Sequence, residues 1–187
     1  MEPRTVFFIG KPGCGKGTQA KLLSEKTGWD IVSAGKQFRK ISREDNPIGR
    51  KIKSEIDAGI LAPHWFAMHL YLQALFEIGT ETNVIFDGFN RKIEEAQLIT
   101  DSLAWLERPF VSIYLRVSDE VVRERLAGRK EIEGRSDDNA VDERLSEYRE
   151  FTDPAIALFR TAGALIEIDG ELPPEEIAKA IHMALSL

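Results

Sequence analysis

Residues 10–18 read Gly10-Lys11-Pro12-Gly13-Cys14-Gly15-Lys16-Gly17-Thr18, between an apolar run at residues 6–9 and a helix-forming segment at residues 18–26. Strand, glycine-rich loop and helix in this order are the setting of a phosphate-binding loop. Glycines let successive backbone N–H groups point at an anion, and the helix N-terminus adds its positive end. Four glycines and a lysine at this spacing disfavour the alternative, a plain turn with a surface lysine. We predict that the loop binds nucleotide phosphates and that Lys16 reaches the outer ones.

The composition is that of a single globular domain, with 187 residues, 43% hydrophobic and 30% charged. The net charge of -6 argues against a nucleic-acid or membrane-surface role based on bulk charge. The single cysteine, Cys14, excludes an intramolecular disulfide and a Cys-rich zinc site, and we expect it to fill space inside the loop. The first residues lead directly into a predicted strand and no apolar run reaches membrane-spanning length, so we expect a cytoplasmic protein without a signal peptide.

Short apolar runs alternate with amphipathic stretches, which is typical of an α/β fold with a parallel sheet. We expect a doubly wound, five-stranded sheet with ligands at the carboxyl ends of its strands. The expected strands are residues 6–9, 29–33, 83–87, 110–117 and 164–169. The expected helices are residues 18–26, 35–42, 47–58, 63–79 with Gly79 as C-cap, 93–105, a helix starting at 118, 141–160 with an interruption near Asp153-Pro154, and 174–185. The charged residues 129–138 should form an exposed loop, and Trp29, Trp65 and Trp105 should pack in the core or between helices.

Asp87 ends a buried strand, where an unpaired carboxylate is costly. Near a phosphate-bound Mg²⁺ the same group is useful, directly or through a water; the alternative is a turn cap beside Gly88. Six arginines form a second set, at positions Arg39, Arg91, Arg125, Arg129, Arg135 and Arg144. Each taken alone reads as a solvated surface charge. Together they fit phosphoryl transfer, which relies on positioning and charge stabilisation by bidentate guanidinium groups.

The chain resembles nucleoside monophosphate kinases of the adenylate kinase family, in the short-lid form, over nearly its whole length. The similarity is strongest at residues 10–19, Ser33-Ala34-Gly35 with Arg39, Asp87-Gly88-Phe89-Asn90-Arg91, residues 134–139 and residues 163–169. It implies a P-loop NTPase fold in a single domain, residues 1–187, with a helical segment for the monophosphate at about 33–63 and a short lid at about 129–138. It also implies reversible phosphoryl transfer from ATP-Mg²⁺ to a monophosphate. The family loop has Gly then Thr after its lysine, which explains why Gly17 stands where the general pattern has a hydroxyl.

The resemblance implies roles for individual residues. ATP would bind to Gly13, Cys14, Gly15, Lys16, Gly17, Thr18, Arg125 and Arg129. The monophosphate would bind to Ser33, Ala34, Gly35, Arg39, Ile56, Leu61, Gly88, Arg91 and Glu95. Catalysis would involve Lys16, Arg91, Arg125, Arg129, Arg135 and Arg144, with Asp137 and Asp138 orienting the lid arginines. Thr18 and Asp87 would hold Mg²⁺.

Four positions on the acceptor side depart from the adenylate kinase pattern. Ala34 resembles UMP/CMP kinases, Lys36 replaces an acidic residue, Asn90 replaces a proline, and Glu95 replaces the glutamine that reads adenine. A carboxylate only accepts hydrogen bonds and would suit a base edge with two donors, or an amine plus a water. Alternatively, Glu95 is a surface residue, and Gln97 or the backbone reads the base.

The spacing from Arg135 to Arg144 is short by about two residues, more than half a helical turn. Arg144 reaches the site only if the loop absorbs the difference.

We expect a monomeric enzyme that takes ATP and a nucleoside monophosphate, with AMP favoured. The alternatives are a UMP/CMP or broad-specificity monophosphate kinase, and a nucleotide-binding regulatory protein with weak or no transfer activity. A small-metabolite kinase is disfavoured by the paired motifs around Arg39 and Arg91.

Overall fold

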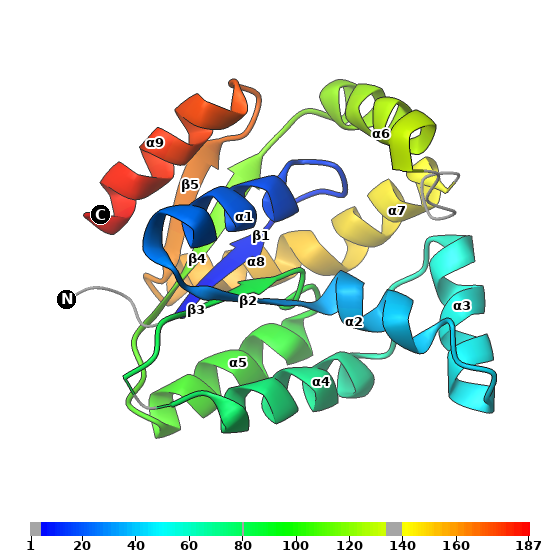
Figure 1. Cartoon of the computed structure of the whole chain (residues 1–187), viewed down its shortest axis with the longest axis horizontal. Coiled ribbons are helices and arrows are strands. Elements are labelled where there is room, and N and C mark those ends of the chain that lie inside the picture. Colours follow the sequence, from blue (N-terminus) through cyan, green and yellow to red (C-terminus); the bar gives the residue numbers. More distant parts are fainter. Residues whose placement is uncertain (1–4, 80, 134–139) are drawn as a thin grey trace.

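The computed structural model describes residues 5–79, 81–133 and 140–187. Its centre is a five-stranded sheet in the order β2-β3-β1-β4-β5, and every pairing is parallel (Figure 1). The strands are β1 Thr5–Ile9, β2 Asp30–Ser33, β3 Val84–Asp87, β4 Phe110–Arg116 and β5 Leu165–Asp169. The predicted α/β fold with a doubly wound parallel sheet is therefore confirmed.

Helices cover both faces of the sheet (Figure 1). On one face lie α1 Lys16–Thr27 and α9 Pro174–Leu185; on the other lie α4 His64–Glu77, α5 Ile93–Trp105 and α8 Asp153–Thr161. The remaining helices are α2 Ala34–Ile41, α3 Pro47–Ala58, α6 Asp119–Glu133, α7 Val141–Glu147 and the π-helical turn η2 Tyr148–Thr152. Within the described ranges, no helix combines the length and apolarity needed to cross a bilayer.

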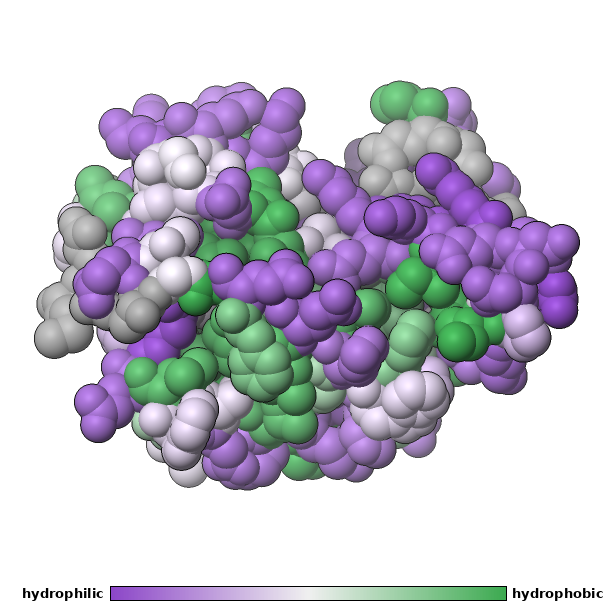
Figure 2. Space-filling model, turned by 60° about the horizontal axis from the view of Figure 1, so that its bottom comes forward, coloured by the Kyte–Doolittle hydropathy of each residue, from purple (hydrophilic) through white to green (hydrophobic). Residues whose placement is uncertain are grey.

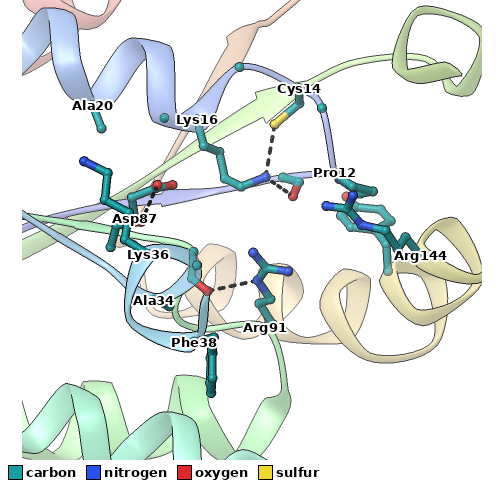
Figure 3. Close-up of a pocket in the computed structure, with 18 of the residues that line it drawn as sticks. Pro12, Cys14, Lys16, Ala20, Ala34, Lys36, Phe38, Asp87, Arg91 and Arg144 are labelled. Atoms are coloured by element: carbon teal, nitrogen blue, oxygen red, sulfur yellow. Dashed lines mark hydrogen bonds between the residues drawn. The ribbon is translucent and has the colours of Figure 1, made fainter. Parts of the chain in front are cut away.

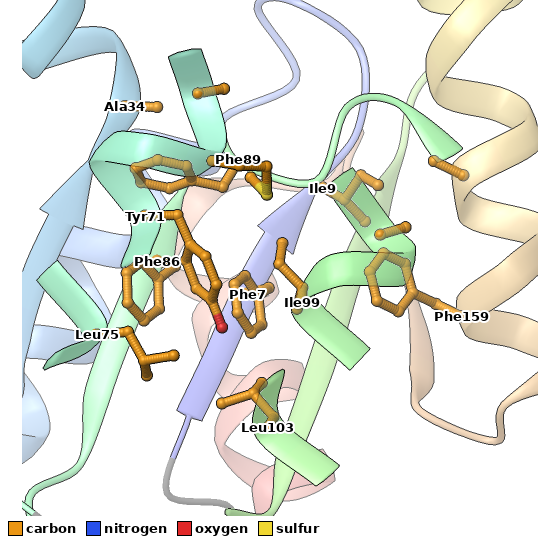
Figure 4. Close-up of a cluster of buried hydrophobic side chains, with 14 of the residues drawn as sticks. Phe7, Ile9, Ala34, Tyr71, Leu75, Phe86, Phe89, Ile99, Leu103 and Phe159 are labelled. Carbon is orange, nitrogen blue, oxygen red and sulfur yellow. The ribbon is translucent and has the colours of Figure 1, made fainter. Parts of the chain in front are cut away.

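The two hydrophobic cores follow from the alternation of side chains along β1. Phe7 and Ile9 point to the face covered by α4, α5 and α8, where the Phe7 ring stacks on Phe86 at 5.1 Å between centroids (Figure 4). Val6 and Phe8 point to the opposite face and pack beneath α1 and α9. Because β1 is fully buried on both sides, it fixes the loop that leaves its carboxyl end.

Two helix ends differ from the sequence-based expectation. Helix α6 continues through Arg129 to Glu133, so the expected loop does not begin at Arg129. Its Lys and Glu residues are good helix formers, and charge alone does not end a helix. Gly79 is not a C-cap, because α4 ends at Glu77 and Ile78 leaves it in an extended conformation and packs against the core. The remainder of the expected loop, residues 134–138, lies outside the described residues.

Two of the three tryptophans are also placed differently from expectation. Trp29 packs against the core, but the side chains of Trp65 and Trp105 are 64% and 82% exposed. Figure 2 shows hydrophobic surface on the face formed by α4 and α5, where Phe76 is 74% exposed. The prediction of core or interhelical packing is therefore wrong for Trp65 and Trp105, since helical apolar spacing does not show which positions the neighbouring elements cover.

The expected interruption in the helix at 141–160 is confirmed and takes the form of η2. A π-helical turn spans Tyr148–Thr152, and α8 restarts with Pro154 in its first turn. Proline is tolerated there because the first-turn N–H groups have no intrahelical partner. The turn rotates the side chains that follow, and places Tyr148 and Thr152 on the wall of the cavity described below.

Candidate functional site

A cavity of about 1060 Å³ lies at the carboxyl ends of the strands, as the parallel sheet predicts. Nearly all sequence-predicted site residues line it. On the loop side these are Gly13, Cys14, Gly15, Lys16, Gly17, Thr18, Arg125, Arg129 and Arg144, and on the other side Ser33, Ala34, Gly35, Arg39, Ile56, Leu61, Asp87, Gly88, Arg91 and Glu95. Arg135, Asp137 and Asp138 lie outside the described residues. One cavity thus contains both predicted halves of the site.

The glycine loop owes its shape to backbone conformations that other residues avoid. Gly10 has φ +145°, and a Cβ at that position would lie 2.8 Å from the carbonyl oxygen of Leu115. Gly15 has φ +102° and is the N-cap of α1, which starts at Lys16. The chain therefore turns tightly from β1 into α1 and presents the N-terminus of α1 to the cavity, where it favours an anion.

The Lys16 side chain folds over this loop. Its Nζ donates hydrogen bonds of 2.7 Å to the carbonyl oxygens of Gly10 and Lys11 and one of 3.4 Å to Cys14 Sγ (Figure 3). Burial lowers the pKa of Lys16, with Cys14 and Asp87 opposing this shift and Arg91 adding to it. The site therefore holds a desolvated ammonium group that an entering phosphate would stabilise in its charged form.

Cys14 is completely buried inside the loop, and its Sγ would lie 2.9 Å from a Cβ on Gly10. A thiol that is closed off from solvent behaves as a small apolar group. This packing agrees with the expected space-filling role.

Asp87 faces the loop because β3 is the neighbour of β1, with Phe8 and Asp87 in register. Its Oδ2 accepts a 3.2 Å hydrogen bond from Ser33 Oγ, and a Cβ on Gly17 would lie 3.7 Å from the same oxygen. Asp87, Ser33 and Thr18 offer the hard oxygen atoms that Mg²⁺ prefers. Among the residues that the structure describes, no group of three or more His, Cys, Asp or Glu side chains could hold a metal ion by itself.

The cationic side chains come from separate elements and converge. Figure 3 shows Lys16, Arg91 and Arg144 pointing into the same space from α1, the β3–α5 turn and α7. Arg91 Nε donates to the Gly88 carbonyl at 2.9 Å, and Thr152 Oγ1 donates to the Arg91 carbonyl at 3.1 Å. The η2 turn therefore holds the backbone of Arg91 in place.

Helices α6 and α7 both bring arginines to the cavity. Arg125 Nη1 donates to the carbonyl oxygens of Gly170 at 2.8 Å and Cys14 at 3.3 Å, which ties α6 to the glycine loop. Arg144 lines the cavity despite its short spacing from Arg135. Arg144 therefore reaches the cavity from α7, which begins at Val141.

Helices α2 and α3 extend from the sheet and bring the end of α3 opposite α7 (Figure 1). The Leu61 N–H donates to Glu147 Oε2 at 2.8 Å, and a Cβ on Gly59 would lie 2.7 Å from the Cβ of Ala140. The second half of the cavity is therefore enclosed between α3 and the α7–η2 segment.

The carboxylate of Glu95 is held by a backbone hydrogen bond and does not project freely into the cavity. The residue is 3% exposed, and its Oε2 accepts a 2.7 Å hydrogen bond from the Arg91 N–H. Burial raises the pKa of Glu95, while the backbone N–H groups of Arg91 and Lys92 oppose that rise. The carboxylate braces the turn that carries Arg91, a role not expected from sequence.

Sequence reasoning missed several polar or aromatic residues that line the cavity, among them Glu55, Glu147, Tyr148 and Thr152. The Asp153-Pro154 signal marks the region of the last three, but it does not show which side chains face inward. Glu55 carried no sequence signal, because a glutamate on an amphipathic helix normally faces solvent.

The chain is similar to known proteins over almost its whole length. The model of the family described as "Adenylate kinase" matches residues 8–164. An adenylate kinase of Thermus thermophilus is 34% identical, covering 98% of each chain. Those of Leptospira biflexa and Thermobifida fusca are both 35% identical, covering 95% and 96% of this chain and 97% of each relative. On these matches, and in agreement with the resemblance in its motifs, the chain belongs to the adenylate kinase family.

Proposed function

We propose that the protein catalyses reversible phosphoryl transfer from ATP-Mg²⁺ to AMP, ATP + AMP ⇌ 2 ADP. The observation that carries this proposal is a single cavity that joins the glycine loop and Lys16 to a second half built around Arg91. Similarity to proteins named adenylate kinase supports AMP as the acceptor. A monomeric state and a cytoplasmic location stay predictions.

The two halves would divide the work. The loop N–H groups and Lys16 hold the donor phosphates, while Arg39 and Arg91 hold the acceptor phosphate. An acceptor phosphate oxygen attacks the γ-phosphorus, the bond from that phosphorus to the β-phosphate oxygen breaks, and ADP leaves. The transition state spreads charge over the transferred group, so catalysis rests on positioning and on cations that face it. Arg125, Arg129, Arg135 and Arg144 would supply that charge.

Magnesium would enter as part of the donor substrate. The hard oxygens of Thr18 and Asp87 fit it, while the described residues form no metal site of their own, so phosphate oxygens and water would complete its ligands. Bound there, Mg²⁺ would neutralise part of the negative charge of the donor phosphates. Ser33, which donates to Asp87, would keep that carboxylate turned toward the loop.

Residues 33–63 would form the monophosphate-binding segment and residues 129–138 the lid. The Leu61–Glu147 hydrogen bond supports the first assignment, because it joins the end of that segment to the opposite wall of the cavity. Closure over both nucleotides would exclude water and so favour transfer to the monophosphate over hydrolysis.

The test is a stoichiometry. ATP, AMP and Mg²⁺ are incubated with the protein, and the nucleotides are separated by anion-exchange chromatography. We expect two ADP for each ATP consumed, with equal loss of ATP and AMP, and the formation of ATP and AMP from ADP alone. One ADP per ATP, with AMP unchanged and inorganic phosphate released, would show hydrolysis and contradict the proposal.

A further inference from the structure

Helix α3 presents one face to the acceptor half of the cavity. Ile52, Glu55, Ile56 and Gly59 all line the cavity, and their spacing of three and four residues puts them on one side of the helix. Three of these positions are apolar or glycine, which suits the flat surface of a base. Glu55 is the only ionisable member of the set.

Glu55 carries an unused hydrogen-bond acceptor. Its side chain is 13% exposed, and its Oε1 lies 3.6 Å from Nζ of Lys51, whose own side chain is 72% exposed. Its Oε2 is buried, and no donor within the described residues hydrogen-bonds to it. A buried acceptor without a partner is destabilising, so this oxygen is placed to gain a donor when a ligand fills the cavity.

Two other carboxylates on this side already accept hydrogen bonds. Glu95 Oε2 accepts from the Arg91 N–H, and Glu147 Oε2 accepts from the Leu61 N–H. A carboxylate has no proton to donate at neutral pH, so Glu55 can pair only with a donor group of the ligand. Adenine offers one in its exocyclic amine, whereas a base with a carbonyl at that position would face Glu55 with a second acceptor.

We propose that Glu55 is a specificity-determining residue whose Oε2 accepts a hydrogen bond from the exocyclic amine of the acceptor base. The inference rests on the proposed function and deepens it, since it names the class of monophosphate that the site selects. Monophosphates of amine-bearing bases are preferred, and those with a carbonyl at the same position are rejected. Specificity then lies on α3, on the segment that closes over the acceptor, rather than at Glu95.

The experiment compares three acceptors that differ at one position of the purine: AMP, purine riboside 5′-monophosphate without the amine, and inosine 5′-monophosphate with a carbonyl. Each is assayed with the wild type and with Glu55→Gln, whose amide accepts from an amine and also donates to a carbonyl. Asp57→Asn is the matched control, because Asp57 is exposed on the same helix, outside the cavity lining, and its change removes the same charge. Dissociation constants of the three monophosphates are measured by calorimetry beside kcat/KM.

For the wild type we expect AMP to exceed the amine-free analogue about 10–100-fold in kcat/KM and in affinity, and the carbonyl analogue by about 100-fold or more. Glu55→Gln should lower the preference for AMP over the carbonyl analogue about tenfold, while Asp57→Asn leaves it unchanged. Equal preferences in wild type and Glu55→Gln would overturn the role of Glu55, even with full AMP kinase activity. Failure of the proposed function would look different, as no transfer from ATP to any of the three acceptors.

Discussion

The two halves of the cavity are built by different means. The donor half is built around one continuous stretch, residues 10–18, whose shape is set by glycine backbone angles and by the N-terminus of α1. Helices α6 and α7 add arginines to it. The acceptor half is assembled from α2, α3, the β3–α5 turn and η2, which are far apart in sequence. The geometry of a site built from backbone groups is determined by a short stretch of sequence. The geometry of a site built from side chains depends on how distant elements pack. The predictions below test this difference.

The largest effect on activity should come from Lys16, the side chain of the glycine loop that would face the donor phosphates. Lys16→Ala removes the ammonium group that would face the donor phosphates, and we expect kcat/KM to fall by about 10³-fold. The measurement is ADP formation from ATP and AMP. Lys26→Ala, on the exposed end of the same helix, is the control and should change the rate less than twofold. A Lys16→Ala variant with more than a tenth of the wild-type rate would refute the assigned role.

Removal of the acceptor clamp should cost nearly as much. Arg91→Ala deletes a guanidinium that would hold the acceptor phosphate and face the transferring group, so we expect a loss of about 10²-fold or more in kcat/KM. ATP affinity, followed by calorimetry, should change little, because the donor half is separate. Arg160→Ala is the comparison, since that arginine pairs with Glu167 on the surface. An Arg91→Ala variant that weakens ATP as much as AMP would break the division into halves.

The backbone origin of the donor half is tested by a pair of glycine substitutions. Gly10→Ala requires a conformation that side chains avoid and brings a Cβ within 2.8 Å of the Leu115 carbonyl oxygen. We expect a loss of about 3 kcal/mol in the free energy of unfolding. Gly28→Ala also has positive φ but meets no atom within 4 Å, so it should cost only about 1 kcal/mol. Urea unfolding gives both values, and equal losses would show that the close approach at Gly10 does not matter.

The smallest effect concerns the acceptor half and its buried carboxylate. Burial raises the pKa of Glu95 in the folded state above its ordinary value of 4.5. The folded protein therefore binds this proton more tightly than the unfolded chain, and stability falls as pH rises from about that ordinary value through the folded pKa. Glu95→Gln should flatten this part of the profile of unfolding free energy against pH. If the unfolding free energy of the variant falls with pH as steeply as that of the wild type, the pKa of Glu95 is not raised on folding.

Much of the fold followed from the sequence, because apolar periodicity marks the elements and the parallel sheet follows from their order. Helix ends were less predictable. Glycine is a common C-cap residue, but α4 ends before Gly79. The apolar residue Ile78 adopts an extended conformation after the helix, and its side chain packs against the core. Arg129 begins a charged run that nevertheless continues α6, since its residues favour a helix.

The site divides in the same way as the cavity. The placement of the residues around Lys16 was predictable because it depends on a local pattern of glycines between a strand and a helix. The orientation of the Glu95 side chain was not predictable from the sequence, because its carboxylate turns toward the backbone N–H of Arg91. Thr152 was also missed, since a π-helical turn shifts the phase of the side chains that a regular helix would give. Glu55 faces the cavity only because α3 folds back across from α7.

The central claim is that one cavity joins a phosphate-binding loop to a site for a second nucleotide, and that this nucleotide is AMP. The most direct measurement is a parallel assay of ATP and Mg²⁺ with AMP, CMP, UMP and GMP, in which both nucleoside diphosphate products are quantified by chromatography. We predict that AMP is the best acceptor and that ADP forms from both substrates. Tight ATP binding with no transfer to any of the four monophosphates would contradict the account, and would favour a protein that binds nucleotides without acting on them.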